Sequence, residues 1–146
     1  MWQCCYPETI NIEKETDIVA ARQVGRNMSR ELGFGTIMQS RIATSISELA
    51  RNIYLYAGVG TITIATVERN GNIGLQITAV DAGPGIPDIR KALEDGYSTS
   101  GALGAGLPGV RRMMDEFDIQ SSQAEGTRVV VVKWRSEGEE GGTGKW

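Results

Sequence analysis

The segment from residue 61 to residue 80 constrains the fold of this chain more than any other. Its sequence, TITIATVERNGNIGLQITAV, alternates apolar and polar residues on both sides of Asn70-Gly71. That dipeptide favours the two-residue turn of a β-hairpin. We therefore predict a hairpin whose second strand ends at Asp81, which places a carboxylate at the end of a strand.

The residues before this hairpin predict one strand and a first helix. The segment from Tyr6 to Glu13 alternates weakly, and helical periodicity follows it, with Thr16 offering an N-cap and Gly33 a C-cap. Arginines recur at every fourth position of this helix and line one stripe: Arg22, Arg26 and Arg30. Such a stripe is typical of a solvated face; the sharper alternative is a docking ridge for an acidic partner.

A second helix is predicted from about Thr36 to Ala57, with Gly58 closing it. Glu48 and Asn52 lie one turn apart on this helix, on the shoulder of its apolar arc. We expect both side chains to be neither fully buried nor fully solvated, where they can face a ligand held against another layer. The arc spans ~60° at about 100° per residue and consists of four residues: Ile42, Ile46, Leu49 and Ile53.

Further elements are expected after the hairpin. Asp88 can cap a short helix over residues 89–96, and Leu107-Pro108 can open another. Two strands are predicted near Ile119–Gln123 and Thr127–Trp134. Pairs of helices between hairpin strands favour an α+β fold, a two-layer α/β sandwich that has a mixed β-sheet with helices on one face.

Length and composition predict how many domains the chain forms and exclude several classes of function. The 146 residues are expected to form one domain over residues 1–135, followed by a disordered, glycine-rich tail over 136–146. The chain has no histidine, which excludes serine-hydrolase triads, histidine-ligated metals and autophosphorylation on histidine. Its net charge of −3, without a basic tract, disfavours nucleic acid as a main partner.

The location of the protein is also constrained by composition. The only cysteines, Cys4 and Cys5, are adjacent and are expected to be reduced and structurally idle. No apolar run reaches the length needed to span a bilayer, and the N-terminus lacks a signal-peptide pattern. We therefore expect a cytoplasmic protein with no membrane partner.

Glycine is the unusual component, with 19 residues in the chain and a cluster between Gly83 and Gly109. In DAGPGIP (81–87), a carboxylate can accept a hydrogen bond from an exocyclic amine while glycines admit a flat ring; the simpler alternative is a strand-ending turn. In SGALGAGLPG (100–109), successive N–H groups can cradle phosphates; the alternative is a surface loop. The EGT motif (125–127) is by itself only a turn.

Three familiar motifs of nucleotide-using proteins are excluded. Gly104, Gly106 and Gly109 match G-x-G-x-x-G, but they do not follow a predicted strand that opens a βαβ unit, so we reject a dinucleotide fold. The terminal GTGKW segment lacks the spacing of a P-loop. The catalytic His-Arg-Asp of eukaryotic-type protein kinases cannot exist in a chain without histidine.

Taken together, the motifs have an order and spacing that the single motifs lack. The series resembles the ATP site, or Bergerat fold, of the GHKL superfamily, which unites gyrase, the Hsp90 chaperone, histidine kinases and MutL. The resemblance covers roughly residues 10–134. It rests on four motifs: Glu48-x-x-x-Asn52, Asp81-x-Gly83-x-Gly85, Gly104-x-Gly106-Leu107 and Gly126-Thr127.

The resemblance implies a role for each matching position. Asn52 would hold Mg²⁺ through its side-chain oxygen, a hard ligand of the kind that Mg²⁺ prefers, and Glu48 would serve as general base. Asp81 would recognise the adenine amine of ATP, and Thr127 would complete the adenine pocket. The glycines Gly83 and Gly85 would lie against the ring. A lid over the phosphates would be formed by Gly104, Gly106 and Leu107.

Longer stretches resemble one group within this superfamily, the switch serine/threonine kinases of bacterial stressosomes (the RsbT type). They are TDIVAARQVGRNMSRELGFG, ISELARNIYLYAG, and the segment from GPGIP at Gly83 to DEF at Phe117. This resemblance implies a kinase that phosphorylates STAS-domain scaffold and antagonist proteins. Once released, it would bind and activate a PP2C-type phosphatase in a partner-switching stress response.

One alternative and one assignment stay open. Anti-sigma factor kinases share the ATP motifs but sequester a sigma factor and phosphorylate an anti-anti-sigma STAS protein. Arg90, Lys91 and Arg111 lie near the expected lid and could reach the γ-phosphate, and the sequence does not choose among them. Arg51 lies at i+3 from Glu48 and can pair with it.

Overall fold

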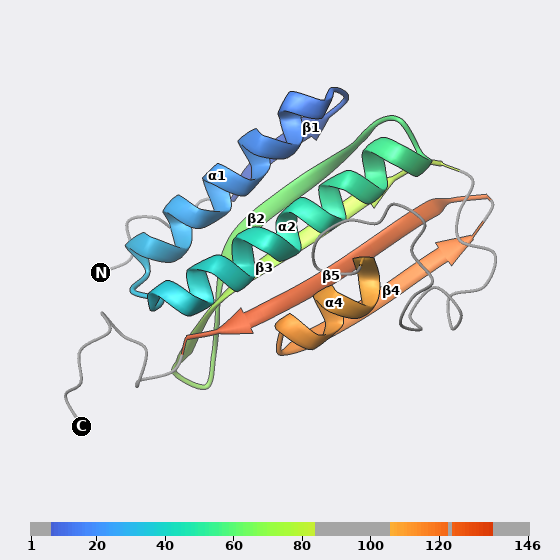
Figure 1. The fold of residues 1–146 in the computed structure, drawn as a ribbon. Helices are drawn as coiled ribbons and strands as arrows, with labels where there is room; N and C mark the ends of the chain where they lie inside the picture. The colour runs from blue at the N-terminus through green and yellow to red at the C-terminus, as the bar shows by residue number, and fades with distance from the viewer. Residues whose placement is uncertain (1–6, 84–105, 123, 136–146) are drawn as a thin grey trace.

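The computed structural model describes residues 7–83, 106–122 and 124–135. These residues form two layers, with three helices on one face of a five-stranded sheet (Figure 1). The α+β fold with helices on one face is therefore confirmed. In the described part of the chain, no helix is both long and apolar enough to cross a membrane. The predicted helix over 89–96 and the predicted tail over 136–146 lie outside the described residues.

All neighbouring strands of the sheet pair antiparallel within the described ranges. The strand order is β1-β2-β3-β5-β4. The prediction of a mixed sheet is therefore wrong: β3 and β4 run in the same direction, but β5 lies between them and pairs with both. The elements are β1 (Glu8–Ile12), α1 (Glu15–Glu31), α2 (Thr36–Tyr56), β2 (Gly60–Arg69), β3 (Asn72–Asp81), α4 (Gly106–Met113), β4 (Glu116–Ser122) and β5 (Gly126–Trp134).

The β2–β3 hairpin forms at the predicted position. Arg69 pairs with Asn72, and the two residues between them, Asn70 and Gly71, have φ angles of 55° and 82°. Positive φ at both central positions is typical of the type I′ turn, whose twist matches that of the paired strands. The register carried along the hairpin places Asp81 at the end of β3, as predicted.

Local polar groups and glycines determine the helix ends. Helix α1 begins at Glu15 with Lys14 as its N-cap, so the prediction of Thr16 as N-cap is wrong. The earlier start is explained by the Asp17 carboxylate, which accepts hydrogen bonds of 2.9 Å from the backbone N–H groups of the two residues before Glu15. Two glycines with positive φ follow the helices where predicted: Gly33 and Gly58.

The core lies between the helices and the sheet and is formed by alternate residues of the strands. Strand residues that face the helices, among them Ile62, Ile64, Leu75 and Ile77, are fully buried. From the helical layer, the four residues of the predicted apolar arc of α2 are each at most 2% exposed. Their burial confirms which side of α2 faces the sheet and thereby sets the direction of its other faces.

A cluster of three side chains joins β2, β4 and β5 at one end of the sheet. Arg69 Nη1 lies 2.7 Å from Glu116 Oε2, and the indole Nε1 of Trp134 donates to the same oxygen at 2.8 Å. The Arg69 guanidinium also stacks 4.9 Å from the centre of the Trp134 ring. These contacts link the side chains of three strands at this end of the sheet. The candidate site lies at the other end.

Gly126, the first residue of β5, lies against the backbone at the end of β3, and its substitution tests how closely these two strands must pack. Its φ is 84°, and a Cβ there would overlap the backbone carbonyl oxygen of Asp81. We expect Gly126→Ala to lower the free energy of unfolding by roughly 2–4 kcal/mol, measured by urea titration.

Gly71→Ala is the matched control for this substitution. Gly71 has a similar φ of 82°, but a Cβ there would meet nothing within 4 Å, so the loss should be only about 1 kcal/mol. Equal losses for the two variants would show that the close contact between β3 and β5 at Gly126 does not limit stability.

Candidate active site

The first part of the site lies on α2, where Glu48 and Asn52 are separated by one turn. The helix packs its apolar arc on the sheet, and α4 packs along its flank. Glu48 is only 2% exposed, whereas Asn52 is half-buried. No described residue forms a hydrogen bond with the Asn52 amide. The helix thus presents a buried carboxylate and an accessible amide oxygen on the same face.

Two groups contact the Glu48 carboxylate. Arg51 Nη1 lies 3.4 Å from Glu48 Oε2, which confirms the i+3 pairing expected from the sequence. The backbone N–H of Gly106, the first residue of α4, also donates to this carboxylate. Burial raises the pKa of the Glu48 carboxyl above its usual range, and the Arg51 charge and the Gly106 N–H oppose this rise.

The expectation that both residues lie on a half-exposed shoulder is met by Asn52 but not by Glu48. A helical wheel describes α2 alone, and on it Glu48 falls beside the buried arc. In the fold, the start of α4 lies against this flank of α2 (Figure 1), so the carboxylate is enclosed. Burial of Glu48 is therefore a consequence of helix–helix packing, which the periodicity of one helix does not contain.

The second part of the site is a row of three polar residues across β3, β5 and β4. Asp81 is opposite Thr127, and Thr127 is opposite Ser121, so all three lie on the same face at the same end of the sheet. The hydroxyl groups of Ser121 and Thr127 are 2.8 Å apart. Asp81 Oδ1 accepts a hydrogen bond of 2.8 Å from the N–H of Gly83. The predicted partners Asp81, Gly83 and Thr127 are thus brought together.

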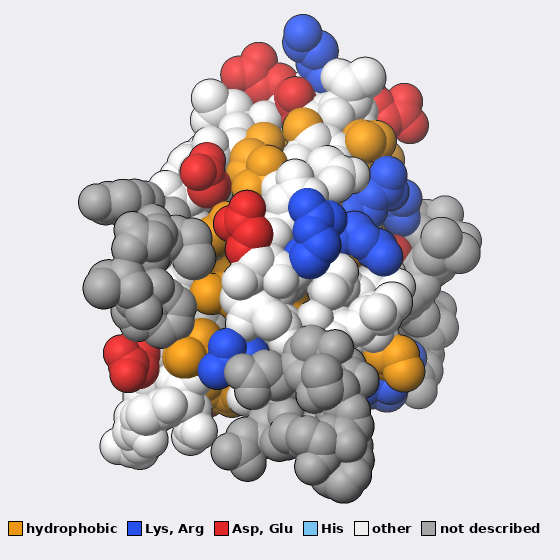
Figure 2. All heavy atoms as spheres, turned by 90° about the vertical axis from the view of Figure 1, so that its left-hand side faces the viewer, with side chains coloured by type: hydrophobic (Ala, Val, Ile, Leu, Met, Phe, Trp, Pro, Cys, Tyr) orange, Lys and Arg blue, Asp and Glu red, His pale blue; other side chains and the backbone are white. Residues whose placement is uncertain are grey.

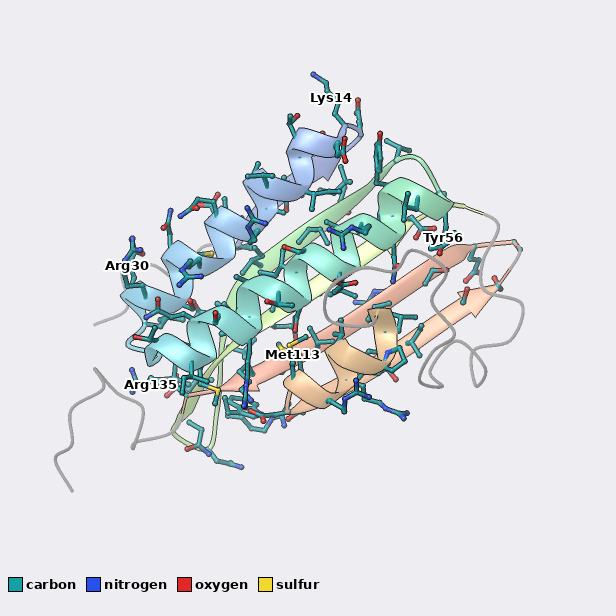
Figure 3. The ribbon with its side chains drawn as sticks, in the orientation of Figure 1. Lys14, Arg30, Tyr56, Met113 and Arg135 are labelled. Carbon is teal, nitrogen blue, oxygen red and sulfur yellow. The ribbon has the colours of Figure 1, made fainter. Side chains whose placement is uncertain are left out.

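Close backbone approach explains the glycines around this row. A Cβ on Gly83 would lie 2.7 Å from the Cβ of Ala57, the residue that ends α2. The segment after β3 therefore packs directly against the end of α2. Figure 3 labels Tyr56 at this end of α2, the same end at which β3 finishes and β5 begins. Glycine at position 83 permits this approach because any larger residue would separate the two elements.

The two parts of the site share one helix as their support. Glu48 and Ala57 are nine residues apart on α2, which corresponds to about 14 Å along the helix axis. The carboxylate of Asp81 is beside one end of this span and the start of α4 is beside the other. An elongated ligand can therefore contact both parts while lying along α2.

The structure describes only some of the residues predicted to lie at the lid, the adenine ring or the γ-phosphate. Leu107 is 7% exposed and packs in the core, and Gly106 begins α4 with a φ of 67°. Arg111 lies exposed on α4. The structure does not describe Gly85, Gly104, Arg90 and Lys91, so their predicted roles stay predictions.

Ser121 was not singled out from the sequence. Its hydroxyl contacts Thr127 and so can fix the direction in which that side chain donates and accepts. The available signal was weak: the residue belongs to a short run, IQSSQ, in a strand that the sequence predicted only approximately. Its importance depends on the β4–β5 register, which aligns Ser121 with Thr127.

The residues present are compatible with Mg²⁺ and ATP. No group of three or more acidic, cysteine or histidine side chains that could hold a metal by themselves occurs within the described ranges. The Asn52 oxygen is a hard ligand that can share Mg²⁺ with nucleotide phosphates, which commonly complete such a site. Glycine at position 83 keeps a Cβ atom away from the Asp81 carboxylate that would meet the base, and glycine at position 126 keeps one away from the Asp81 backbone.

Residues 38–137 match the family described as histidine kinase-, DNA gyrase B-, and HSP90-like ATPase. The chain belongs to this family. It is also 64% identical over 125 residues to the serine/threonine-protein kinase RsbT of Bacillus subtilis (strain 168), a match that covers 86% of this chain and 94% of that protein. The predicted superfamily and the predicted enzyme class, protein-serine/threonine kinase, are therefore confirmed, and membership of this ATPase family implies use of ATP.

More distant similarity links the chain to anti-sigma F factors. The protein from Caldanaerobacter subterraneus subsp. tengcongensis is 29% identical over 99 residues, and that from Thermoanaerobacter sp. (strain X514) is 31% identical over 98 residues. Each match covers 64% of this chain and 68% of the relative. Similarity to both kinds of protein supports a kinase of the partner-switching type.

The raised pKa of Glu48 makes a prediction about stability. Because the pKa of Glu48 is raised in the folded protein, the ionised carboxylate destabilises the fold. This penalty is absent below pH 4.5, the ordinary pKa of the group, and it grows as the pH rises from there toward the pKa of the folded state. We expect Glu48→Gln to raise the free energy of unfolding at pH 7.5 by a few tenths to about 1 kcal/mol. The gain should shrink as the pH falls through 4.5, which urea titrations at several pH values would measure.

Glu8→Gln, on the exposed start of β1, serves as the control for this substitution. It removes the same charge without removing a buried carboxylate. If Glu48→Gln and Glu8→Gln change stability equally at all pH values, burial of the Glu48 carboxylate does not weaken the fold.

Proposed function

We propose that this chain is a Mg²⁺- and ATP-dependent serine/threonine kinase that phosphorylates STAS-domain proteins of a stressosome. Once released from them, it binds and activates a PP2C-type phosphatase in a partner-switching stress response. The observation that carries this proposal is the placement of Glu48 and Asn52 on one face of α2, with Glu48 against the first residue of α4. The identity with a serine/threonine-protein kinase over most of the chain supports the acceptor class.

The nucleotide is assigned to the two parts of the site. Asp81 accepts a hydrogen bond from the adenine amine, while Gly83 admits the ring and Thr127, oriented by Ser121, completes the pocket. Asn52 would hold Mg²⁺ through its side-chain oxygen; ATP would supply the transferable phosphoryl group, and Mg²⁺ would neutralise the charge on its phosphates. The N–H groups in the first turn of α4 other than that of Gly106, which donates to Glu48, would face the phosphates.

Glu48 is assigned as the general base. Its carboxylate takes the proton from the incoming serine or threonine hydroxyl as the hydroxyl oxygen bonds to the γ-phosphorus and the bond from that phosphorus to the leaving ADP breaks. Phosphoryl transfer has a loose transition state and depends mainly on positioning and charge stabilisation, so a carboxylate is a sufficient base. Enclosure of Glu48 by α4 limits the access of water, which favours transfer to a protein hydroxyl over hydrolysis.

The assignments of base and adenine contact are tested by two substitutions with different effects. Glu48→Gln should bind ATP with an affinity close to that of the parent but transfer label from γ-labelled ATP to a STAS-domain protein at least 100-fold more slowly. Asp81→Asn should weaken ATP binding by roughly tenfold or more in calorimetric titration, because its NH₂ group can face the adenine amine donor.

Each outcome can contradict one assignment. Undiminished ATP affinity in Asp81→Asn would remove Asp81 from the adenine pocket. Label transfer at the parental rate by Glu48→Gln would remove Glu48 as the base without affecting the nucleotide assignment. Label that appears on no STAS-domain protein, although ATP binds, would contradict the proposed substrate class.

An anti-sigma function is the second candidate, favoured by the 29–31% identity to anti-sigma F factors. In that case the chain sequesters a sigma factor and phosphorylates an anti-anti-sigma STAS protein. Co-elution with a sigma factor on size exclusion, without activation of a phosphatase, distinguishes this function from the first. Activation of a PP2C-type phosphatase supports the first.

The arginine stripe on α1 is proposed as the partner-docking surface. Arg22 and Arg30 are exposed, Arg26 is half-buried, and in the described part of the chain none of the three pairs with a carboxylate. Figure 2, which shows the left-hand side of Figure 1, contains a group of basic side chains with acidic side chains beside it. Although the whole chain has a net charge of −3, the three arginines make this surface locally positive, and a positive surface suits an acidic partner.

Arg22→Glu tests this docking surface. We expect binding to the STAS-domain and phosphatase partners to weaken by roughly tenfold or more, with ATP affinity unchanged. Arg128→Glu, the same charge change at an exposed position of β5 on the other face of the sheet, should leave partner binding intact. Equal partner affinity in both variants, measured by surface plasmon resonance, would leave the stripe as a solvated face.

A further inference from the structure

Arg51 is the charged residue of the site to which neither the motifs nor the comparisons give a role. It lies between the proposed base and the proposed metal ligand in the sequence, and its guanidinium is directed back toward Glu48, 3.4 Å away. The two partners differ in their surroundings, because the side chain of Arg51 is 32% exposed whereas that of Glu48 is 2% exposed. A partly solvated cation thus contacts an enclosed carboxylate.

We propose that Arg51 is a positioning residue for phosphoryl transfer, which keeps the buried carboxylate of Glu48 ionised and directed at the first residue of α4. The inference rests on the proposed function, because it takes Glu48 as the base. It adds a residue that the ATP-site motifs do not include, since Arg51 falls on one of the unspecified positions of Glu48-x-x-x-Asn52.

The need for such a residue follows from burial. An enclosed carboxyl group favours its neutral form, and a neutral carboxylic acid cannot accept the proton of an attacking hydroxyl. The described groups that favour the ionised form of Glu48 are the Arg51 guanidinium and the N–H of Gly106. Other polar residues about one turn from Glu48 on α2, such as Ser45 and Asn52, are uncharged. Arg51 is therefore the full charge that opposes the effect of burial.

The two donors also fix the direction of the carboxylate. Arg51 reaches Oε2 from the same helix, where an i,i+3 spacing brings side chains together. Gly106 approaches from α4, and its φ of 67° sets the direction of the chain where this helix begins. A carboxylate held from two elements has fewer orientations than one held from α4 alone. Loss of Arg51 would therefore affect both the charge of the base and its alignment.

The first test measures the protonation of Glu48 without nucleotide. Carboxyl carbons of glutamate are labelled with ¹³C, and the Glu48 signal is identified by its absence in Glu48→Gln. Arg51→Gln should shift the titration of this signal to higher pH, because loss of the cation makes ionisation harder. Arg51→Lys, which keeps the charge, should titrate close to the parent. A signal that titrates identically in the parent and in Arg51→Gln would overturn the proposal.

The second test follows label transfer to a STAS-domain protein as a function of pH. In Arg51→Gln the acid limb of the kcat profile should move to higher pH, with a rate lower by roughly twofold to tenfold on that limb and a smaller loss at high pH. The KM for ATP should stay close to that of the parent. Arg51→Lys should restore most of the rate. Circular dichroism establishes that both variants are folded.

The outcomes separate this inference from the proposed function. A raised KM for ATP with an unmoved acid limb would overturn the proposal and make Arg51 a nucleotide contact. Full label transfer by Glu48→Gln would contradict the base assignment itself, whatever Arg51 does. An inactive Glu48→Gln beside an Arg51→Gln that matches the parent at every pH would keep the base and reject Arg51 alone.

Discussion

The enclosed carboxylate of Glu48 is the interaction on which the rest of the site depends. Burying a charge is unfavourable unless it is paired and hydrogen-bonded. Here the pairing comes from Arg51 on α2 and the hydrogen bond from Gly106 on α4, so the same side chain links two helices. A group that costs stability is thereby held where a proton acceptor is needed, an arrangement typical of active sites.

The opposite part of the site depends on backbone proximity instead of charge. Asp81, Thr127 and Ser121 form one row because three antiparallel strands are aligned in register. Gly126 permits β3 and β5 to approach closely at that row, and Gly83 permits the chain to pass against the end of α2. The two glycines thus permit close packing at this end of the strands.

Much of the fold was predictable because its signals are local. The turn at Asn70-Gly71 and the apolar arc of α2 depend on neighbouring residues, and both were found where predicted. The predictions that failed involve distant contacts or competing local groups. The mixed sheet is wrong because β5 inserts between β3 and β4, and Thr16 is not the N-cap because the carboxylate of Asp17 caps two earlier N–H groups.

The sequence by itself determined the family, through the order of the glycine and carboxylate motifs, and the spacing that places Glu48 and Asn52 on one face of a helix. Only the tertiary structure decided that Glu48 is enclosed and Asn52 accessible, because α4 covers one and leaves the other half-buried. It also decided that Ser121 lies beside Thr127. Helical spacing is a property of one segment, whereas burial and strand register arise when distant segments pack together.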